Sequence, residues 1–262
     1  MIDPLYTRVG VILHGNNRFL GRETYDAWNH ELVTAGDALL AALGATQLDA
    51  TAREALRLGV LCLISPDARV WPLKLTRILA SYGDPLAGLF AGQLVTAGRV
   101  MGPNAAQYAA MGLAYVAERV GEAGSDDDIR GAMAEWKQRV PGGKLGGFGV
   151  PFREADERRD ALLRYVENTA IADGRHWRLH TRVVKVMESL RPNIVISLAA
   201  MVLDLGIPAT RAGAALSAFM APVFLAHALE AAEQDGARLH SLPPDVVDYR
   251  GPAARTTVAR PR

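Results

Sequence analysis

The densest group of residues with binding chemistry is a glycine-rich segment at positions 141–151, which reads Pro-Gly-Gly-Lys-Leu-Gly-Gly-Phe-Gly-Val-Pro. Glycine adopts backbone angles that other residues avoid, and its missing Cβ lets a ligand approach the backbone closely. Lys144 lies inside the segment and Arg153 follows it. Backbone N–H groups and these basic side chains could together receive phosphates. The segment is neither a P-loop, which needs Gly-Lys-Ser/Thr before a helix, nor a dinucleotide-binding fingerprint.

Two other polar groups have spacings that invite comparison with metal sites. His176 and His180 are four residues apart, which places them on one face of a helix, but no Glu completes a metalloprotease pattern. Asp126, Asp127 and Asp128 suit the positive end of a helix, and their spacing is not that of an EF-hand loop. We therefore expect a solvated helix face and a solvated helix cap, and no metal ion.

The helices that must position these residues are visible in the apolar spacing and in the prolines and glycines between them. A short β-like run at 8–14 comes first, followed by a turn at Gly15, Asn16 and Asn17. Ala and Leu dominate the rest and favour helix. The sequence predicts an all-α protein of about ten helices. The first is predicted over 24–43 and ends at Gly44, and the second runs from Asp49 or Thr51 to Ser65. Four more begin near Pro72, Pro85, Pro103 and Asp126. The last four are predicted over 154–172, 176–190, 194–205 and 210–234.

Composition excludes several classes of protein. The 29 basic and 28 acidic side chains leave a formal charge of +1, without the basic footprint of sequence-independent nucleic-acid binding. A single cysteine, Cys62, excludes an intramolecular disulfide framework and a cysteine-rich zinc site. The sequence contains no run of about eighteen apolar residues, so it predicts no membrane span. The first residues lack a signal-peptide pattern. We expect a cytoplasmic protein that binds neither nucleic acid nor membrane.

The glycine-rich segment also resembles a stretch of the citrate synthase and citryl-CoA lyase family. The family has Lys-Ile-Pro-Gly-Phe-Gly-His and then Asp-Pro-Arg, where this chain has Lys144 to Val150 and then Asp156-Glu-Arg-Arg. Other similar stretches keep the family's order over nearly the whole chain: Gly98–Asn104, Arg191–Val195, Leu205–Pro208, Phe224–Glu230 and Tyr249–Pro252. The resemblance implies a citrate synthase-like homodimer. Its large helical domain would span residues 1–105 and 222–262, and its smaller domain, on the acyl-CoA side, residues 106–221.

The same alignment of motifs places apolar residues at the family's catalytic positions. The family uses a carboxylate to take a proton from the α-carbon of a thioester, and histidines to hydrogen-bond the enolate and the oxo-acid. Here Val195 stands at the carboxylate position, and Val150 and Met101 stand at two histidine positions. Met220 stands where the family has an arginine. None of these side chains transfers a proton near neutral pH, so the catalytic residues of this chain are unknown.

The resemblance assigns two further sets of residues. The candidate CoA-binding set is Lys144, Gly147, Phe148, Gly149, Arg153 and Arg159, and the candidate substrate pocket contains His14, Arg77, Asn104, Asn193, Met220 and His227. Ordinary structural roles compete with several of these assignments. They are an ion pair for Arg77, a hydrogen bond at a helix start for Asn104, a bend for Asn193, and a satisfied core position for His227.

Two functional hypotheses follow from these residues. In the first, a citrate synthase-like homodimer binds an acyl-CoA or related small acyl ligand and performs acyltransferase or lyase chemistry on a less polar substrate. A CoA thioester is then a co-substrate, and no cofactor is tightly bound. In the second, the chain is a catalytically inactive binding or regulatory subunit, with an active paralogue as its partner. An open pocket that closes on CoA favours the first hypothesis, and a pocket filled by its own side chains favours the second.

Overall fold

The architecture is described from a computed structural model of the chain. The structure describes residues 7–13, 16–23, 32, 34–64, 67–98, 101–150, 155–234, 245, 248 and 250–252. In this part, three short strands precede ten α-helices. The strands are β1 (Gly10–Leu13), β2 (Asn16–Phe19) and β3 (Arg22–Glu23). The helices are α1 (Ala35–Leu43), α2 (Ala50–Leu63), α3 (Trp71–Tyr82), α4 (Pro85–Thr96), α5 (Gly102–Val120), α6 (Asp126–Arg139), α7 (Glu157–Val166), α8 (Arg175–Val186), α9 (Ile194–Asp204) and α10 (Ala212–Ala232). The predicted all-α class with a short β-like N-terminal segment is confirmed.

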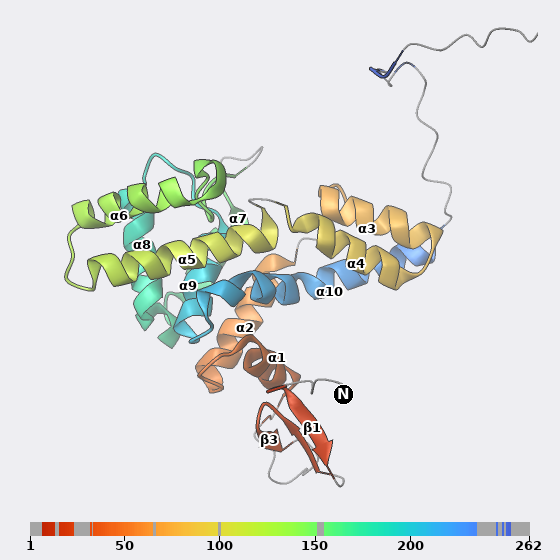
Figure 1. Ribbon diagram of the computed structural model, residues 1–262, viewed down its shortest axis with the longest axis horizontal. Coiled ribbons are helices and arrows are strands. Elements are labelled where there is room, and N and C mark those ends of the chain that lie inside the picture. Colours follow the sequence, from red (N-terminus) through yellow and green to blue (C-terminus); the bar gives the residue numbers. More distant parts are fainter. Residues whose placement is uncertain are drawn as a thin grey trace, which may run out of the picture.

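The N-terminal segment is a small antiparallel sheet in the order β1-β2-β3, at the end of the molecule beyond α1 (Figure 1). Gly10 pairs with Phe19 in the first ladder, and Arg18 pairs with Glu23 in the second. Sequence analysis predicts the first strand but places a turn at Asn16 and Asn17, and there it is wrong. Asn16 pairs with Leu13 and Asn17 pairs with Ile12, so both asparagines belong to strand β2.

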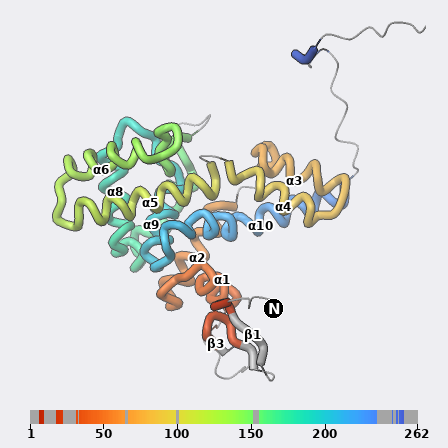
Figure 2. Tube along the Cα trace, viewed as in Figure 1, coloured from red at the N-terminus to blue at the C-terminus, as the bar shows by residue number. Residues whose placement is uncertain are grey.

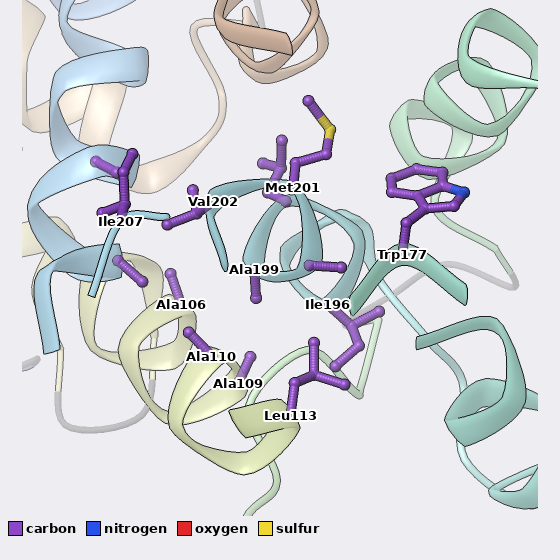
Figure 3. Close-up of a cluster of buried hydrophobic side chains, with 14 of the residues drawn as sticks. Ala106, Ala109, Ala110, Leu113, Trp177, Ile196, Ala199, Met201, Val202 and Ile207 are labelled. Carbon is purple, nitrogen blue, oxygen red and sulfur yellow. The ribbon is translucent and has the colours of Figure 1, made fainter. Parts of the chain in front are cut away.

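The main core forms where α5 packs against α9. Figure 3 shows the small side chains of α5 directed at α9, which supplies Ile196, Ala199 and Val202. Alanine lets the two helix axes approach closely, and α9 is buried from Ile196 to Val202. This core also receives residues from α1, α2, α6, α7 and α8, and its last member in α10 is Phe219.

A second unit, which we call the arm, consists of α3, α4 and the C-terminal half of α10 (Figures 1 and 2). Its own small core is Leu73, Val223 and Phe224. Gly92 brings α4 close to α3, because a Cβ there would lie 1.8 Å from Thr76 Oγ1. Pro222 lies inside α10 between the two cores and removes one helical hydrogen bond there. The predicted domain limits at 105 and 222 fall near the start of α5 and at this proline, and they stay a prediction.

Helix α10 connects both units. It contacts α2, α3, α4, α5 and α9. By length and composition, residues 209–232 could cross a membrane, but half of their most apolar window is buried inside the protein. A helix that packs against five others is the central helix of a folded core. Its apolar surface is therefore explained by packing.

Most helix limits follow the predicted caps. The Asp49 carboxylate caps α2 by accepting from Ala52 N, and Gly44 ends α1 at φ 90°. The predicted helix over 24–43 starts too early, because Thr34 and Asp37 form a reciprocal capping box that begins α1 at Ala35. The N-terminal part of that prediction, 24–31, lies outside the described residues. Asp126, Asp127 and Asp128 lie in the first turn of α6, capped by Ser125.

Candidate active site

The glycine-rich segment lies between the N-terminal turns of α5 and α9. A Cβ on Gly146 would lie 2.3 Å from the carbonyl oxygen of Ala105, and one on Gly147 would lie 2.9 Å from the backbone N of Ile196. Gly147 and Gly149 have φ values of 84° and 96°, in the left-handed region that favours glycine. These contacts and angles explain the glycines at 146, 147 and 149, and they hold the backbone of the segment against both helices.

The glycine-rich segment is closely packed on the side that faces the protein core, and it has more space beside Gly149. Beneath it, a cavity of about 10 Å³ is bounded by Gly146, Leu145 and Ile196 among others, which is about the space of one water molecule. By contrast, a Cβ on Gly149 would meet no atom of the described residues within 4 Å. Gly142, near the start of the segment, has the same open space, and the N–H of Gly149 donates to the carbonyl of Arg191 at 2.7 Å.

Asn193 fastens the segment to α9. Its backbone N–H donates to the carbonyl of Gly147 at 2.9 Å, and its side-chain Nδ2 donates to the carbonyl of Gly149 at 2.9 Å. Its Oδ1 accepts from Val195 N at 3.0 Å and so caps α9. The predicted bend at Asn193 is thus a helix cap that also fixes the loop. Val150 comes directly after Gly149 in the sequence, and Val195 lies two residues after Asn193. Both side chains are partly buried.

Asp156 links the same helix to α7. Its Oδ2 accepts from Ile194 N at 2.9 Å, its Oδ1 accepts from Arg158 N, and both oxygens receive the Arg158 guanidinium at 2.8 Å. Burial alone would raise the pKa of this carboxyl, but the Arg158 guanidinium and the two N–H groups hold its pKa below the ordinary value. Asp156 is absent from the predicted site, although an aspartate directly before a helix is a capping signal in the sequence.

The start of α5 carries two of the predicted site residues. Met101 is the N-cap residue, makes no side-chain capping hydrogen bond and is 46% exposed. Asn104 donates from Nδ2 to the carbonyls of Gly98 and Ala97, at 2.8 and 3.3 Å. Asn104 therefore joins the end of α4 to the start of α5. This is the hydrogen-bonding role at a helix start that competes with its assignment to the substrate pocket.

Arg77 and His227 come together across the arm, 150 positions apart in the sequence. The Arg77 guanidinium lies 3.2 Å from His227 Nδ1, forms an ion pair with Glu230, and donates to Gln234 at 3.1 Å. Because a guanidinium only donates, Nδ1 of His227 accepts, and its ring proton is on Nε2. His227 and Glu230 also line an open groove of about 450 Å³ with Ile64, Pro222, Val223 and Ala226. His227 is thus both buried, at 8% exposure, and adjacent to open space.

The remaining predicted residues are placed as follows. Met220 packs between the main core and the core of the arm. Lys144 is exposed, and Phe148 pairs its backbone with Pro192. Arg159 is half-buried with Nε unpaired among the described residues, and burial lowers the pKa of its guanidinium. His14 and Arg153 lie outside the described residues.

The expectation of a solvated face at His176 and His180 is wrong. His180 is fully buried, with Nδ1 donating to the Trp177 carbonyl at 2.6 Å and Nε2 lying 3.2 Å from Ser197 Oγ. His176 is also largely covered, because Asp204 accepts from its backbone N and its Nδ1 at 2.8 and 2.9 Å. Both histidines face α9 because α8 turns this side to the core.

Comparisons with known proteins place this geometry in a fold. No protein-family model matches the chain, and no curated protein matches its sequence. Solved structures do match. Citryl-CoA lyase from Hydrogenobacter thermophilus is 18% identical, with a TM-score of 0.73 and 97% of both chains covered. ATP citrate lyase from Methanothrix soehngenii, in complex with citrate and coenzyme A, is 15% identical with a TM-score of 0.74. It covers 97% of this chain, which spans only 43% of that protein.

Citrate synthase from Thermotoga maritima is 16% identical, with a TM-score of 0.56 over 81% of this chain and 56% of that one. The chain therefore spans nearly the whole length of the lyase but only part of the two longer proteins. The resemblance drawn from the order of the motifs is confirmed at the level of the fold. The chain has the all-α citrate synthase-like fold that citryl-CoA lyase and citrate synthase share.

Proposed function

We propose that this chain binds an acyl-CoA or a related acyl ligand at the glycine-rich segment and performs neither citrate synthesis nor citryl-CoA cleavage. The observation that carries the proposal is the clamp at Asn193, which holds the carbonyls of Gly147 and Gly149. Among the described residues, no atom fills the space beside Gly149, and the neighbouring side chains, Val150 and Val195, are apolar. The binding backbone is thus well ordered, and the side chains beside it cannot exchange protons.

The proposal divides the ligand between two parts of the site. Phosphates of the CoA moiety lie against backbone N–H groups of the segment, with Lys144 as the exposed cation beside them. The acyl group lies towards Val150, Val195 and Met101, where apolar contact stabilises a less polar chain than citrate. Any acyl or C–C bond chemistry then depends on shape and backbone hydrogen bonds. The structure of ATP citrate lyase with coenzyme A, a protein of the same fold, supports the choice of ligand class.

The turnover of citrate-type substrates is the first prediction. Incubation with acetyl-CoA and oxaloacetate, or with citryl-CoA, is expected to give no product above the uncatalysed rate, because Met101, Val150 and Val195 supply no acid or base. A thiol reagent that detects free CoA measures citrate synthesis. Cleavage of citryl-CoA releases oxaloacetate and no free thiol, so it is measured by coupling oxaloacetate to NADH oxidation by malate dehydrogenase. A citryl-CoA lyase assayed in parallel is the positive control. Rapid formation of citrate or of acetyl-CoA would contradict the proposal.

A second candidate function is an inactive binding or regulatory subunit. The contacts of Arg77 and Asn104 favour it, since both side chains are occupied by partners within the protein. Loss of citrate turnover fits both candidates, so binding separates them. A protein that binds no CoA thioester but forms a complex with an active paralogue would be a subunit of this kind.

We also propose that the protein forms a homodimer through the arm. Helix α4 contains no charged residue, and it exposes Leu86, Phe90 and Leu94 at 54%, 58% and 74%. These residues are four apart and form one stripe along the helix. Leu79 and Tyr82 of α3, the helix packed against α4, are also exposed, and exposed apolar patches of this kind mark interaction surfaces. A second copy of the same arm covers the stripe by two-fold symmetry.

Phe90→Asp is expected to weaken this dimer by at least about tenfold, because it places a charge in the centre of an apolar interface. Light scattering coupled to size-exclusion chromatography measures the molar mass. Tyr165→Asp, at a 59% exposed aromatic side chain on α7, is the matched control and leaves the mass unchanged. A wild-type protein that is monomeric, or a Phe90→Asp variant that stays dimeric, would contradict the proposed interface.

A further inference from the structure

A second cavity lies far from the glycine-rich segment, where the C-terminal end of α5 meets α8. Its volume is about 290 Å³, and it is lined by Ala117, Gly121, Glu122, Arg175, Arg178, Leu179 and Arg182. Helix α5 carries Met101 at one end and this cavity at the other. At a rise of about 1.5 Å per residue, the length of α5 separates the two by roughly 27 Å. The cavity therefore does not belong to the proposed acyl-CoA site.

The three arginines lie on one face of α8. Positions 175, 178 and 182 follow the spacing that brings helical side chains together. Glu122 is the single acidic residue among the lining residues, so the lining carries two positive charges in excess. The N–H groups in the first turn of α8 are occupied by Asp204 from the other side, at 2.8 Å from His176 N and Trp177 N. The positive charge of the cavity therefore comes from the arginine side chains.

The partners of these arginines leave one of them available. Arg175 donates to the Ala117 carbonyl at 3.4 Å and lies 3.6 Å from Glu122. Arg182 donates to the Gly124 carbonyl at 2.6 Å and to Asp126 at 3.0 Å, and Lys185 approaches the same carboxylate. The guanidinium of Arg178 makes no hydrogen bond or ion pair within the described part of the chain. Arg178 therefore lies between two anchored arginines, and within the described residues the N–H donors of its guanidinium are available for a ligand.

We propose that this cavity is a binding site for a small molecule that carries phosphate or pyrophosphate groups. A guanidinium presents paired N–H donors that match phosphate oxygens, and Arg175 and Arg182 are already held in place by their protein partners. The site is concave and of the size that one such group with a small substituent fills. A flat basic surface would suit an extended nucleic acid, whereas an open hollow between two helices suits a small anion.

Inorganic pyrophosphate is the probe for this site, with isothermal titration calorimetry at low salt as the measurement. Saturable binding is expected with one site per protomer, and Arg178→Gln is expected to weaken it about tenfold through loss of a charge-assisted contact. Because Arg178 is exposed and its guanidinium has no partner in the described chain, the variant keeps the melting temperature of the wild type. Arg164→Gln, which removes an exposed arginine of α7 outside the cavity, is the matched control and binds like the wild type.

A cross-check separates this site from the proposed acyl-CoA site. Lys144→Gln is expected to weaken acyl-CoA binding. Its pyrophosphate affinity is expected to stay within about twofold of the wild type, because no ionic contact to pyrophosphate is lost. Absence of saturable pyrophosphate binding would overturn the proposal. Equal affinity in the wild type and Arg178→Gln would also overturn it, as would an equal loss in Lys144→Gln.

Discussion

Replacement of Asp156 by alanine is expected to lower the free energy of unfolding by about 2–4 kcal/mol. The carboxylate is 4% exposed and satisfies the N–H of the buried Ile194 as well as the first turn of α7. Its removal leaves the Ile194 N–H without an acceptor and removes the cap. The Arg158 guanidinium contributes less, because its side chain is 38% exposed and can return to water. Urea unfolding followed by circular dichroism measures the change.

Asp127→Ala is the matched control for this variant. It also removes an aspartate that pairs with an arginine near a helix start, but its side chain is 90% exposed. We expect a loss below about 1 kcal/mol. Asp156→Asn retains an oxygen acceptor and should fall between the two. An Asp156→Ala protein as stable as Asp127→Ala would show that the link between α7 and α9 does not stabilise the site.

The stability of the protein is expected to fall by about 3 kcal/mol as the pH decreases from about 6.5 to about 4, through His180 alone. Burial lowers the pKa of this histidine from 6.5 to about 4, and the nearby Arg159 guanidinium acts in the same direction, whereas the Trp177 carbonyl and Asp204 oppose it. In this window the unfolded chain binds a proton that the folded protein excludes. The contribution of His180 is therefore complete above pH 6.5 and is lost as the pH falls to 4.

Carboxylates act in a separate window. The pKa values of Asp37 and Asp156 are lowered in the folded protein, so their contribution is present above about pH 4 and is lost below it. Urea unfolding at half-unit steps from pH 7.5 to 5.5 therefore reports mainly the histidines, because the lowered carboxylate pKa values act at lower pH. His180→Asn keeps a donor for the Trp177 carbonyl and does not titrate, so its stability should depend less on pH. Identical pH dependence of the variant and the wild type would contradict the buried neutral assignment.

Sequence reasoning predicted the fold well because the signals for it are local. Asp49, Gly44 and Pro103 mark the ends of helices through their own backbone chemistry, and the structure confirms these positions. Apolar spacing alone begins α1 too early, because it ignores the capping box of Thr34 and Asp37. The strands β2 and β3 were missed because short polar strands carry little alternation.

The site was harder to predict because its contacts are not local. Arg77 and His227 meet across 150 positions, and neither residue signals the other. Helix periodicity placed His176 and His180 on one face but did not say that α9 covers this face. The glycines of the segment were recognised as special, and the structure adds the reason, which is their contact with Ala105 and Ile196. Local sequence patterns do not reveal which residues distant along the chain pack against each other, and these contacts form the site.

The most direct test of the proposed function is native mass spectrometry of the protein with acetyl-CoA, hexanoyl-CoA and citryl-CoA. The apolar lining of Val150 and Val195 predicts one ligand per protomer, with hexanoyl-CoA bound at least about tenfold more tightly than citryl-CoA. Lys144→Gln, measured in parallel, is expected to weaken all three thioesters alike, since it touches only their shared CoA moiety. Failure of all three to bind the wild type, or a preference for citryl-CoA, would contradict an acyl-CoA site adapted to an apolar acyl group.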